Sequence, residues 1–156
     1  MEGLERIVLA HPFFAGLEAE LGQLVSGCAR NLRFNRDQYL FHEGDAANEF
    51  YLIRQGVVAL EMLPPGQSPV VFTTEGEGEF VGTSWLIPPY RWRFDARAME
   101  LTRAIGIDAR CLRDKCEADH HLGYEMMKRF LPVITKRLDE ARLQLLDVYG
   151  KRDKRA

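Results

Sequence analysis

A glycine-rich segment near the middle of the chain has residue types that can bind an anion through the backbone. Its seven consecutive residues are Gly78, Glu79, Phe80, Val81, Gly82, Thr83 and Ser84. Glycine allows tight turns, in which several backbone N–H groups point toward one negatively charged group. A short helical turn after the second glycine would add the positive end of its dipole. We therefore predict a site for a phosphate or another small anion here.

The segment that follows a proline pair supplies further candidate side chains for this site, Arg91, Trp92 and Arg93. Apolar and polar residues alternate from position 92 to position 98, so the tryptophan shares one strand face with apolar residues. A shift of the strand by one residue would bury three charged side chains together, which is costly. We therefore predict that Trp92 points into the fold and that Arg93 points outward.

Hydrophobic periodicity divides the single predicted domain, residues 1–156, into four parts. Residues 1–30 have helical spacing and form a helical lead-in that Pro12 interrupts. Residues 31–108 alternate with period two between glycine-containing turns, which predicts a barrel. Residues 109–150 return to helical spacing, and residues 151–156 are a charged tail. The predicted fold class is mainly β with flanking α: an antiparallel double-stranded β-helix (jelly roll, cupin-like) with N-terminal helices and a long C-terminal helix.

The C-terminal part is predicted to contain two helices. Asp108 can cap a first helix over Ala109–Cys116, and Asp119 can cap a second. The second should kink at Pro132, where a backbone hydrogen bond is lost. Apolar residues recur along it with alternating spacings of three and four, which predicts a parallel homodimer; the alternative is a helix packed only on its own barrel. These residues include Tyr124, Met127, Leu131, Ile134, Leu138, Ala141 and Leu145.

Composition excludes several classes of protein. The 156 residues carry a net charge of −2, which argues against nucleic-acid binding by general basicity. No apolar run is long enough to cross a membrane, and the N-terminus lacks the order of a secretory signal. Cys28, Cys111 and Cys116 form neither an even set nor a CxxC pair, so we expect reduced thiols in a cytoplasmic protein.

No arrangement of residues in the sequence predicts catalysis or metal binding. Neither a Ser/His/Asp order nor a Cys-His pair stands out, and His42-Glu43 lacks the His-x-His partner of a cupin metal site. The pair His120-His121 falls at a helix start, where solvent exposure is expected. We therefore predict that the protein is not an enzyme and has no metal.

Three segments give the chain a resemblance to a known family. Residues 11–17 read His-Pro-Phe-Phe-Ala-Gly-Leu, residues 40–60 form a block with the glycines of two turns, and residues 145–150 read Leu-Leu-Asp-Val-Tyr-Gly. This pattern resembles the cyclic-nucleotide-binding domain of the catabolite activator and fumarate–nitrate regulator superfamily. The resemblance implies a homodimer that forms through the C-terminal helix and a cyclic nucleotide or another small anionic molecule as ligand.

The chain departs from the family pattern at two positions of the phosphate-binding segment. Cyclic-nucleotide binders usually have Glu where this chain has Thr83, and an Arg that pairs with the phosphate falls on Trp92 when counted back from Arg97-Ala98. Counting forward from Thr83 places Arg93 there instead, and Arg91 is a third candidate. The resemblance therefore predicts a pocket that does not bind cyclic AMP in the usual way and either holds another ligand or is closed by Trp92.

Transcription factors of this superfamily continue into a helix-turn-helix domain, whereas this sequence ends six residues after Gly150. A recognition helix needs its own small core, so we expect a stand-alone domain with no sequence-specific DNA binding of its own and no membrane partner. The predicted function is a ligand-sensing regulatory module. The alternatives are a protein-interaction scaffold with a vestigial pocket, and a transcription-regulator relative that acts on DNA only through a partner.

Overall fold

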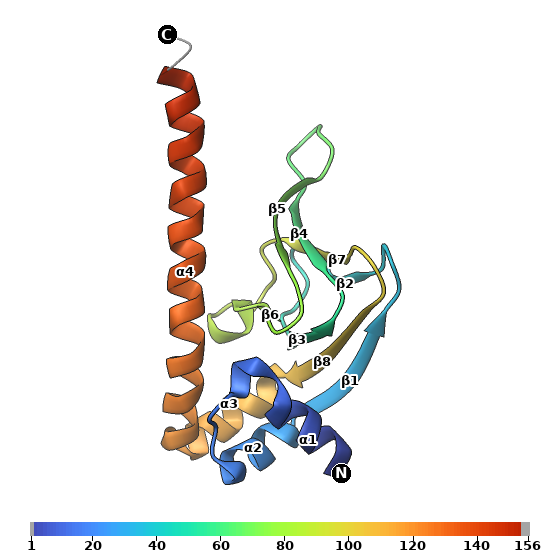
Figure 1. Ribbon diagram of the computed structural model, residues 1–156, viewed down its shortest axis with the longest axis vertical. Helices are drawn as coiled ribbons and strands as arrows, with labels where there is room; N and C mark the ends of the chain where they lie inside the picture. The colour runs from blue at the N-terminus through green and yellow to red at the C-terminus, as the bar shows by residue number, and fades with distance from the viewer. Residues whose placement is uncertain (1, 154–156) are drawn as a thin grey trace.

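The computed structural model describes residues 2–153, in which two four-stranded antiparallel sheets are flanked by helices (Figure 1). The N-terminal helices are α1 (Glu2–Ala10), the 3-10 turn η1 (Pro12–Phe14) and α2 (Ala19–Ser26). The strands are β1 (Ala29–Phe34), β2 (Tyr39–Phe41), β3 (Glu49–Gln55), β4 (Val58–Met62), β5 (Val70–Glu75), β6 (Phe80–Val81), β7 (Asp95–Ala98) and β8 (Thr102–Asp108). The remaining elements are the 3-10 turn η2 (Ser84–Leu86), α3 (Ala109–Ala118) and α4 (His120–Asp153).

The two sheets have the strand orders β1-β8-β3-β6 and β2-β7-β4-β5, and every pairing is antiparallel. Strands far apart in the sequence are neighbours, because β8 lies between β1 and β3 with Leu32 and Ile53 both opposite Ala104. The predicted fold class, a mainly β jelly roll with flanking helices, is confirmed.

Gly56, between β3 and β4, shows why the turns of this barrel need glycine. Its φ is 102°, and a Cβ added there would lie 2.7 Å from the carbonyl oxygen of Leu101 and from the Cα of Thr102. Both contacts are with backbone, which cannot move aside, so another residue would strain the turn and open the adjoining strands.

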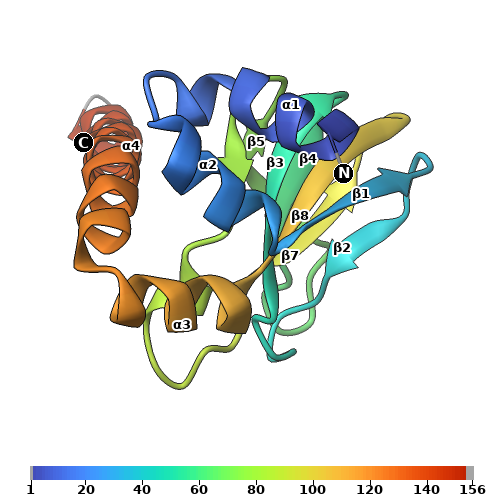
Figure 2. The ribbon, with the colours of Figure 1, turned by 90° about the horizontal axis from the view of Figure 1, so that it is seen from below.

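The N-terminal helices cover the outer side of the first sheet (Figure 2). An aromatic cluster joins the first sheet to α4. The ring of Phe50 in β3 stacks on Trp85 of η2, with centroids 4.7 Å apart, and contacts Phe130 of α4 edge-on. Buried His11, at the break that Pro12 causes, accepts a hydrogen bond from Phe13 N at Nδ1, so Nε2 donates to the carbonyl of Ile53. Burial lowers the pKa of His11, so the neutral ring is favoured.

The two predicted caps of the C-terminal helices are confirmed. Asp108 accepts from Cys111 N at 2.8 Å, and Asp119 accepts from the backbone of His121 and Leu122. Helix α3 ends at Ala118, two residues beyond the predicted Cys116. Helix α4 continues through Pro132 as one helix and extends past the barrel (Figure 1).

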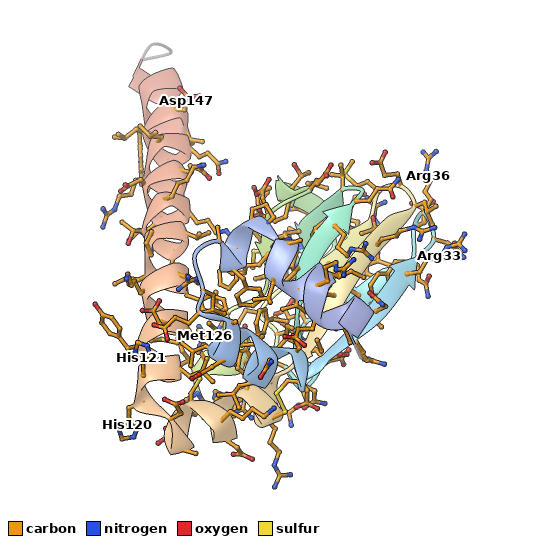
Figure 3. All side chains as sticks on the ribbon, turned by 60° about the horizontal axis from the view of Figure 1, so that its bottom comes forward. Arg33, Arg36, His120, His121, Met126 and Asp147 are labelled. Carbon is orange, nitrogen blue, oxygen red and sulfur yellow. A yellow bond between two sulfur atoms is a disulfide. The ribbon has the colours of Figure 1, made fainter. Side chains whose placement is uncertain are left out.

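Side chains on the first half of α4 fix the helix to the rest of the fold. Met126 is fully buried on the side of the helix that faces the barrel, whereas Asp147 lies far along the projecting half (Figure 3). His121, at the corner between α3 and α4, pairs with Glu18 just before α2 at 3.0 Å. The helix is therefore anchored at its start and unsupported by its own barrel toward its end.

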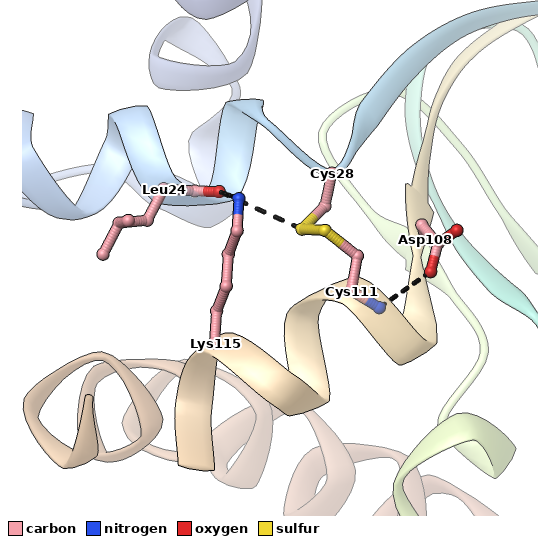
Figure 4. The surroundings of a disulfide bond; sticks show 5 residues. All are labelled: Leu24, Cys28, Asp108, Cys111 and Lys115. Carbon is pink, nitrogen blue, oxygen red and sulfur yellow. Dashed lines mark hydrogen bonds between the residues drawn. A yellow bond between two sulfur atoms is a disulfide. The ribbon is translucent and has the colours of Figure 1, made fainter. Parts of the chain in front are cut away.

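The prediction of three reduced cysteines is wrong for two of them, because Cys28 and Cys111 are joined by a disulfide (Figure 4). Pairing of β1 with β8 places Ala29 opposite Ile107, which brings the residue before β1 close to the start of α3. The two Cα atoms are 5.7 Å apart, although 83 positions separate them in the chain. Cys116 is a free thiol.

No helix within residues 2–153 is long and apolar enough to cross a membrane. In the same part of the chain, no three His, Cys, Asp or Glu side chains gather as a metal site.

Candidate ligand-binding site

A cavity of about 250 Å³ lies between the barrel and α4. One wall comes from the second sheet, a second wall from the glycine-rich segment, and the third from the middle of α4. The residues that line it are Leu60, Phe72, Thr73, Glu75, Gly82, Thr83, Phe94, Ile134, Arg137, Glu140, Ala141 and Gln144. A larger cavity of about 650 Å³ runs beside it toward η1 and shares Thr73, Glu75, Arg137 and Glu140 with it.

The predicted anion-binding segment lies between these two cavities. Gly82 and Thr83 line the smaller cavity, and Gly78, Glu79 and Phe80 line the larger one. Buried Val81 belongs to β6, which pairs with β3, and Ser84 begins the predicted short helical turn, η2. Gly78 and Gly82 have φ values of 84° and 109°, as a tight glycine turn requires.

Trp92 fills the space beside the second glycine. Its side chain is 3% exposed, its ring stacks on Phe41 with centroids 3.7 Å apart, and a Cβ added to Gly82 would lie 2.4 Å from the indole. Arg93 is exposed, so the two side chains point inward and outward as alternation predicts. The indole therefore leaves no room for another group directly beside this glycine.

The two candidate arginines of the loop do not reach the cavity. Arg91 forms a bridge with Ala46, and its guanidinium donates to the carbonyl of Gly44 at 2.8 Å. Arg93 is turned toward solvent, and neither side chain lines the smaller cavity. The structure therefore brings together the glycine-rich segment and Trp92, but places both arginines outside.

Sequence reasoning missed Arg137 of α4, which contacts the glycine-rich segment directly. Its Nη2 atom donates to the carbonyl of Phe80 at 2.5 Å and lies 3.3 Å from Oε2 of Glu75. The guanidinium carbon is 4.3 Å from the centre of the Phe80 ring, within the range of a cation–π contact. Phe80 and Arg137 are 57 positions apart in the chain, so no local pattern in the sequence indicates their contact.

Glu75, at the end of β5, was also missed, and it is the buried acid of the site. Its side chain is 4% exposed, and burial raises its pKa to about 8, with a further rise from the neighbouring carboxyl of Glu79. The charge of Arg137 acts in the opposite direction but does not cancel these effects. At neutral pH this carboxyl is therefore mostly protonated.

A jelly roll that carries a long C-terminal helix is the fold of one known family of regulatory domains. The family model for the cyclic nucleotide-binding domain matches residues 31–119, which is more than half of the sequence. The chain therefore belongs to the cyclic nucleotide-binding domain family. No curated protein matches it in sequence.

Solved structures support this assignment. A protein of Geobacter metallireducens GS-15, provisionally named a cyclic nucleotide-binding protein, has a TM-score of 0.75 and 28% identity, over 88% of this chain and 99% of that one. A cyclic nucleotide-binding domain from Methylobacillus flagellatus KT has a TM-score of 0.76 at 21% identity, over 93% and 82% of the two chains. Thermus thermophilus catabolite activator protein has a TM-score of 0.69 at 22% identity, over 86% of this chain and 61% of that one. The last two likenesses show the fold alone.

Proposed function

We propose that this domain is a ligand-sensing regulatory module, without catalytic activity, whose pocket does not hold cyclic AMP in the usual way. The observation that carries the proposal is the burial of Trp92 against Gly82. Counted back from Arg97-Ala98, the family resemblance places a phosphate-binding arginine at this position; counted forward from Thr83, it places the arginine at Arg93, which is exposed. An arginine would offer a charged, bidentate grip on a phosphate, whereas an indole offers one N–H and no charge.

The packing of Trp92 also resists opening of the pocket. Its ring lies between Phe41 and Gly82, so a ligand phosphate could approach the second glycine only if the ring moved. Exposing a buried aromatic side chain costs about 1.5–3 kcal/mol. Usual cyclic-nucleotide binding would therefore lose the charge-assisted contact and meet this cost as well.

Thr83 changes the other expected contact of the cassette. Its side chain lines the cavity and can donate or accept one hydrogen bond, but it has no charge. A carboxylate at this position would accept from a sugar hydroxyl with the greater strength of a charged acceptor. Both departures act in the same direction, against a cyclic nucleotide.

The exposed face of α4 supports a homodimer as the working form. All seven residues of the predicted seam are exposed in the single chain: Tyr124, Met127, Leu131, Ile134, Leu138, Ala141 and Leu145. A contiguous apolar stripe of this kind is typical of a surface that pairs with a partner. Because Ile134 and Ala141 also line the cavity, a second α4 would border the ligand site.

The burial of Trp92 equally supports a second candidate, a protein-interaction scaffold whose pocket is closed. Mass spectrometry of the purified native protein distinguishes the two, because a co-purified small molecule is expected only for a ligand sensor. Calorimetric titration with cyclic AMP and cyclic GMP tests the claim about the usual ligands. We expect no binding in the micromolar range.

A further inference from the structure

The cavity beneath α4 has a cation that comes from the helix. Among the described residues, Arg137 is the one arginine or lysine that lines the smaller cavity. Arg91 is held by the carbonyl of Gly44, and Arg93 faces solvent. Any anionic group that enters this cavity therefore meets Arg137 first.

Three contacts hold the guanidinium of Arg137 at the glycine-rich segment. It donates to the Phe80 carbonyl, lies over the Phe80 ring and faces the carboxyl of Glu75. The side chain is 26% exposed, so it is packed against the barrel but still reached from the cavity. A planar guanidinium has five N–H donors, so these contacts leave donors for a ligand.

Glu75 does not fully neutralise this arginine at neutral pH, because burial keeps most of its carboxyl protonated. The other groups that face Glu75 are Glu79 at the glycine-rich segment and Glu140 on α4, and Lys136 lies 4.0 Å from Glu140. The two additional acids favour the protonated form of Glu75. Arg137 therefore keeps a positive charge that no buried, ionised partner fully balances.

The other walls of the cavity complement a small molecule with an apolar body. Leu60, Phe72, Phe94 and Ile134 supply apolar surface, and Thr83 supplies a hydroxyl. We propose that Arg137 is the anion-binding residue of this cavity and that its ligand is a small organic anion with an aromatic or apolar body. This inference rests on the proposed ligand-sensing function and assigns the charged contact that Trp92 does not provide.

A bound anion would share Arg137 with Glu75, so the proposal predicts a specific pH dependence. Below its pKa the carboxyl of Glu75 is neutral and does not repel an anion bound beside it. As the pH rises through that pKa, the carboxylate forms, repels the anion and competes for Arg137. Anion affinity should therefore fall as the pH rises through about 8.

The experiment uses benzenesulfonate, which stays an anion over the whole pH range, and benzenesulfonamide, its neutral counterpart of similar shape. Binding is followed through the methyl NMR signals of Leu60 and Ile134, which line the cavity. We expect saturable shifts of these signals with the sulfonate. The affinity for the sulfonamide, obtained from the same signals, should be at least about tenfold weaker. Arg137→Gln should weaken sulfonate binding at least about tenfold, whereas Lys136→Gln should change it less than about twofold.

The pH series tests the same contact without removing the arginine. Sulfonate affinity of the wild type should fall by about tenfold between about pH 6.5 and about pH 9, and Glu75→Gln should abolish this dependence. Unmoved methyl signals, equal binding by Arg137→Gln, or a pH dependence that Glu75→Gln retains would overturn the proposal. Micromolar cyclic AMP binding would instead overturn the proposed function. The comparison of sulfonate binding between the wild type and Arg137→Gln would still test the role of Arg137.

Discussion

The rings of Trp92 and Phe41 are stacked, with centroids 3.7 Å apart and planes 9° from parallel. This contact holds the indole against Gly82, beside the glycine-rich segment. In our proposal, this packed aromatic pair lies where a charged ligand contact would otherwise be. The proposal gives this residue two roles, one in the stability of the barrel and one in closing part of the pocket.

Replacing Trp92 should show this structural role. Trp92→Ala removes a buried aromatic ring, so we expect the free energy of unfolding to fall by about 3–5 kcal/mol. Chemical denaturation measures the loss. The exposed neighbour offers a matched control, since Arg93→Ala should change stability by less than about 0.5 kcal/mol. Equal effects of the two changes would show that Trp92 does not support the fold.

The disulfide between Cys28 and Cys111 should contribute to stability. It joins the segment after α2 to the start of α3 and closes a long loop, so the double change to serine should cost about 2–5 kcal/mol. Thermal denaturation with and without reductant measures this cost. Cys116→Ser, which removes the free thiol, should leave the response to reductant unchanged. Alkylation of all three cysteines in the unreduced, unfolded protein would contradict the bond.

Glu75 should make stability depend on pH. Its pKa is raised from 4.5 to about 8, so the folded chain binds this proton more tightly than the unfolded chain. The contribution of this carboxyl to stability is therefore complete at low pH and is lost as the pH rises toward about 8. Denaturation midpoints across this window should fall in the wild type and stay flatter in Glu75→Gln. Glu77→Gln, an exposed carboxyl two residues on, should keep the slope of the wild type.

The apolar face of α4 should mediate dimer formation. Leu131 lies on the predicted seam and is 64% exposed, whereas Leu143 lies off the seam and is 65% exposed. Leu131→Glu would place like charges in the interface, so we expect a monomer in analytical ultracentrifugation. Leu143→Glu should remain a dimer. A monomeric wild type, or a dimer that survives Leu131→Glu, would exclude this interface.

Local signals in the sequence were sufficient for much of the fold. Period-two alternation predicted the barrel, and Asp108 and Asp119 were predicted as caps because capping depends on residues three positions away. Alternation also predicted the orientation of Trp92 relative to Arg93. Trp92 lies in contact range of Gly82, so the loop and the glycine-rich segment are neighbours in the fold.

The missed features all depend on contacts between distant segments. Arg137 reaches Phe80 across 57 positions, and Cys28 meets Cys111 only because β1 pairs with β8. The burial of Glu75 follows from the position of α4 over the end of β5 and has no counterpart in its neighbouring residues.

Calorimetric titration of the wild-type protein with cyclic AMP and cyclic GMP tests the central claim most directly. Trp92 supplies neither the charge nor the space for the cyclic phosphate, so we expect no dissociation constant in the micromolar range for either nucleotide. The folded state of the same sample is checked by its NMR spectrum. Micromolar or tighter binding of either nucleotide would contradict the account, because it would show that the buried indole does not keep these ligands out of the pocket.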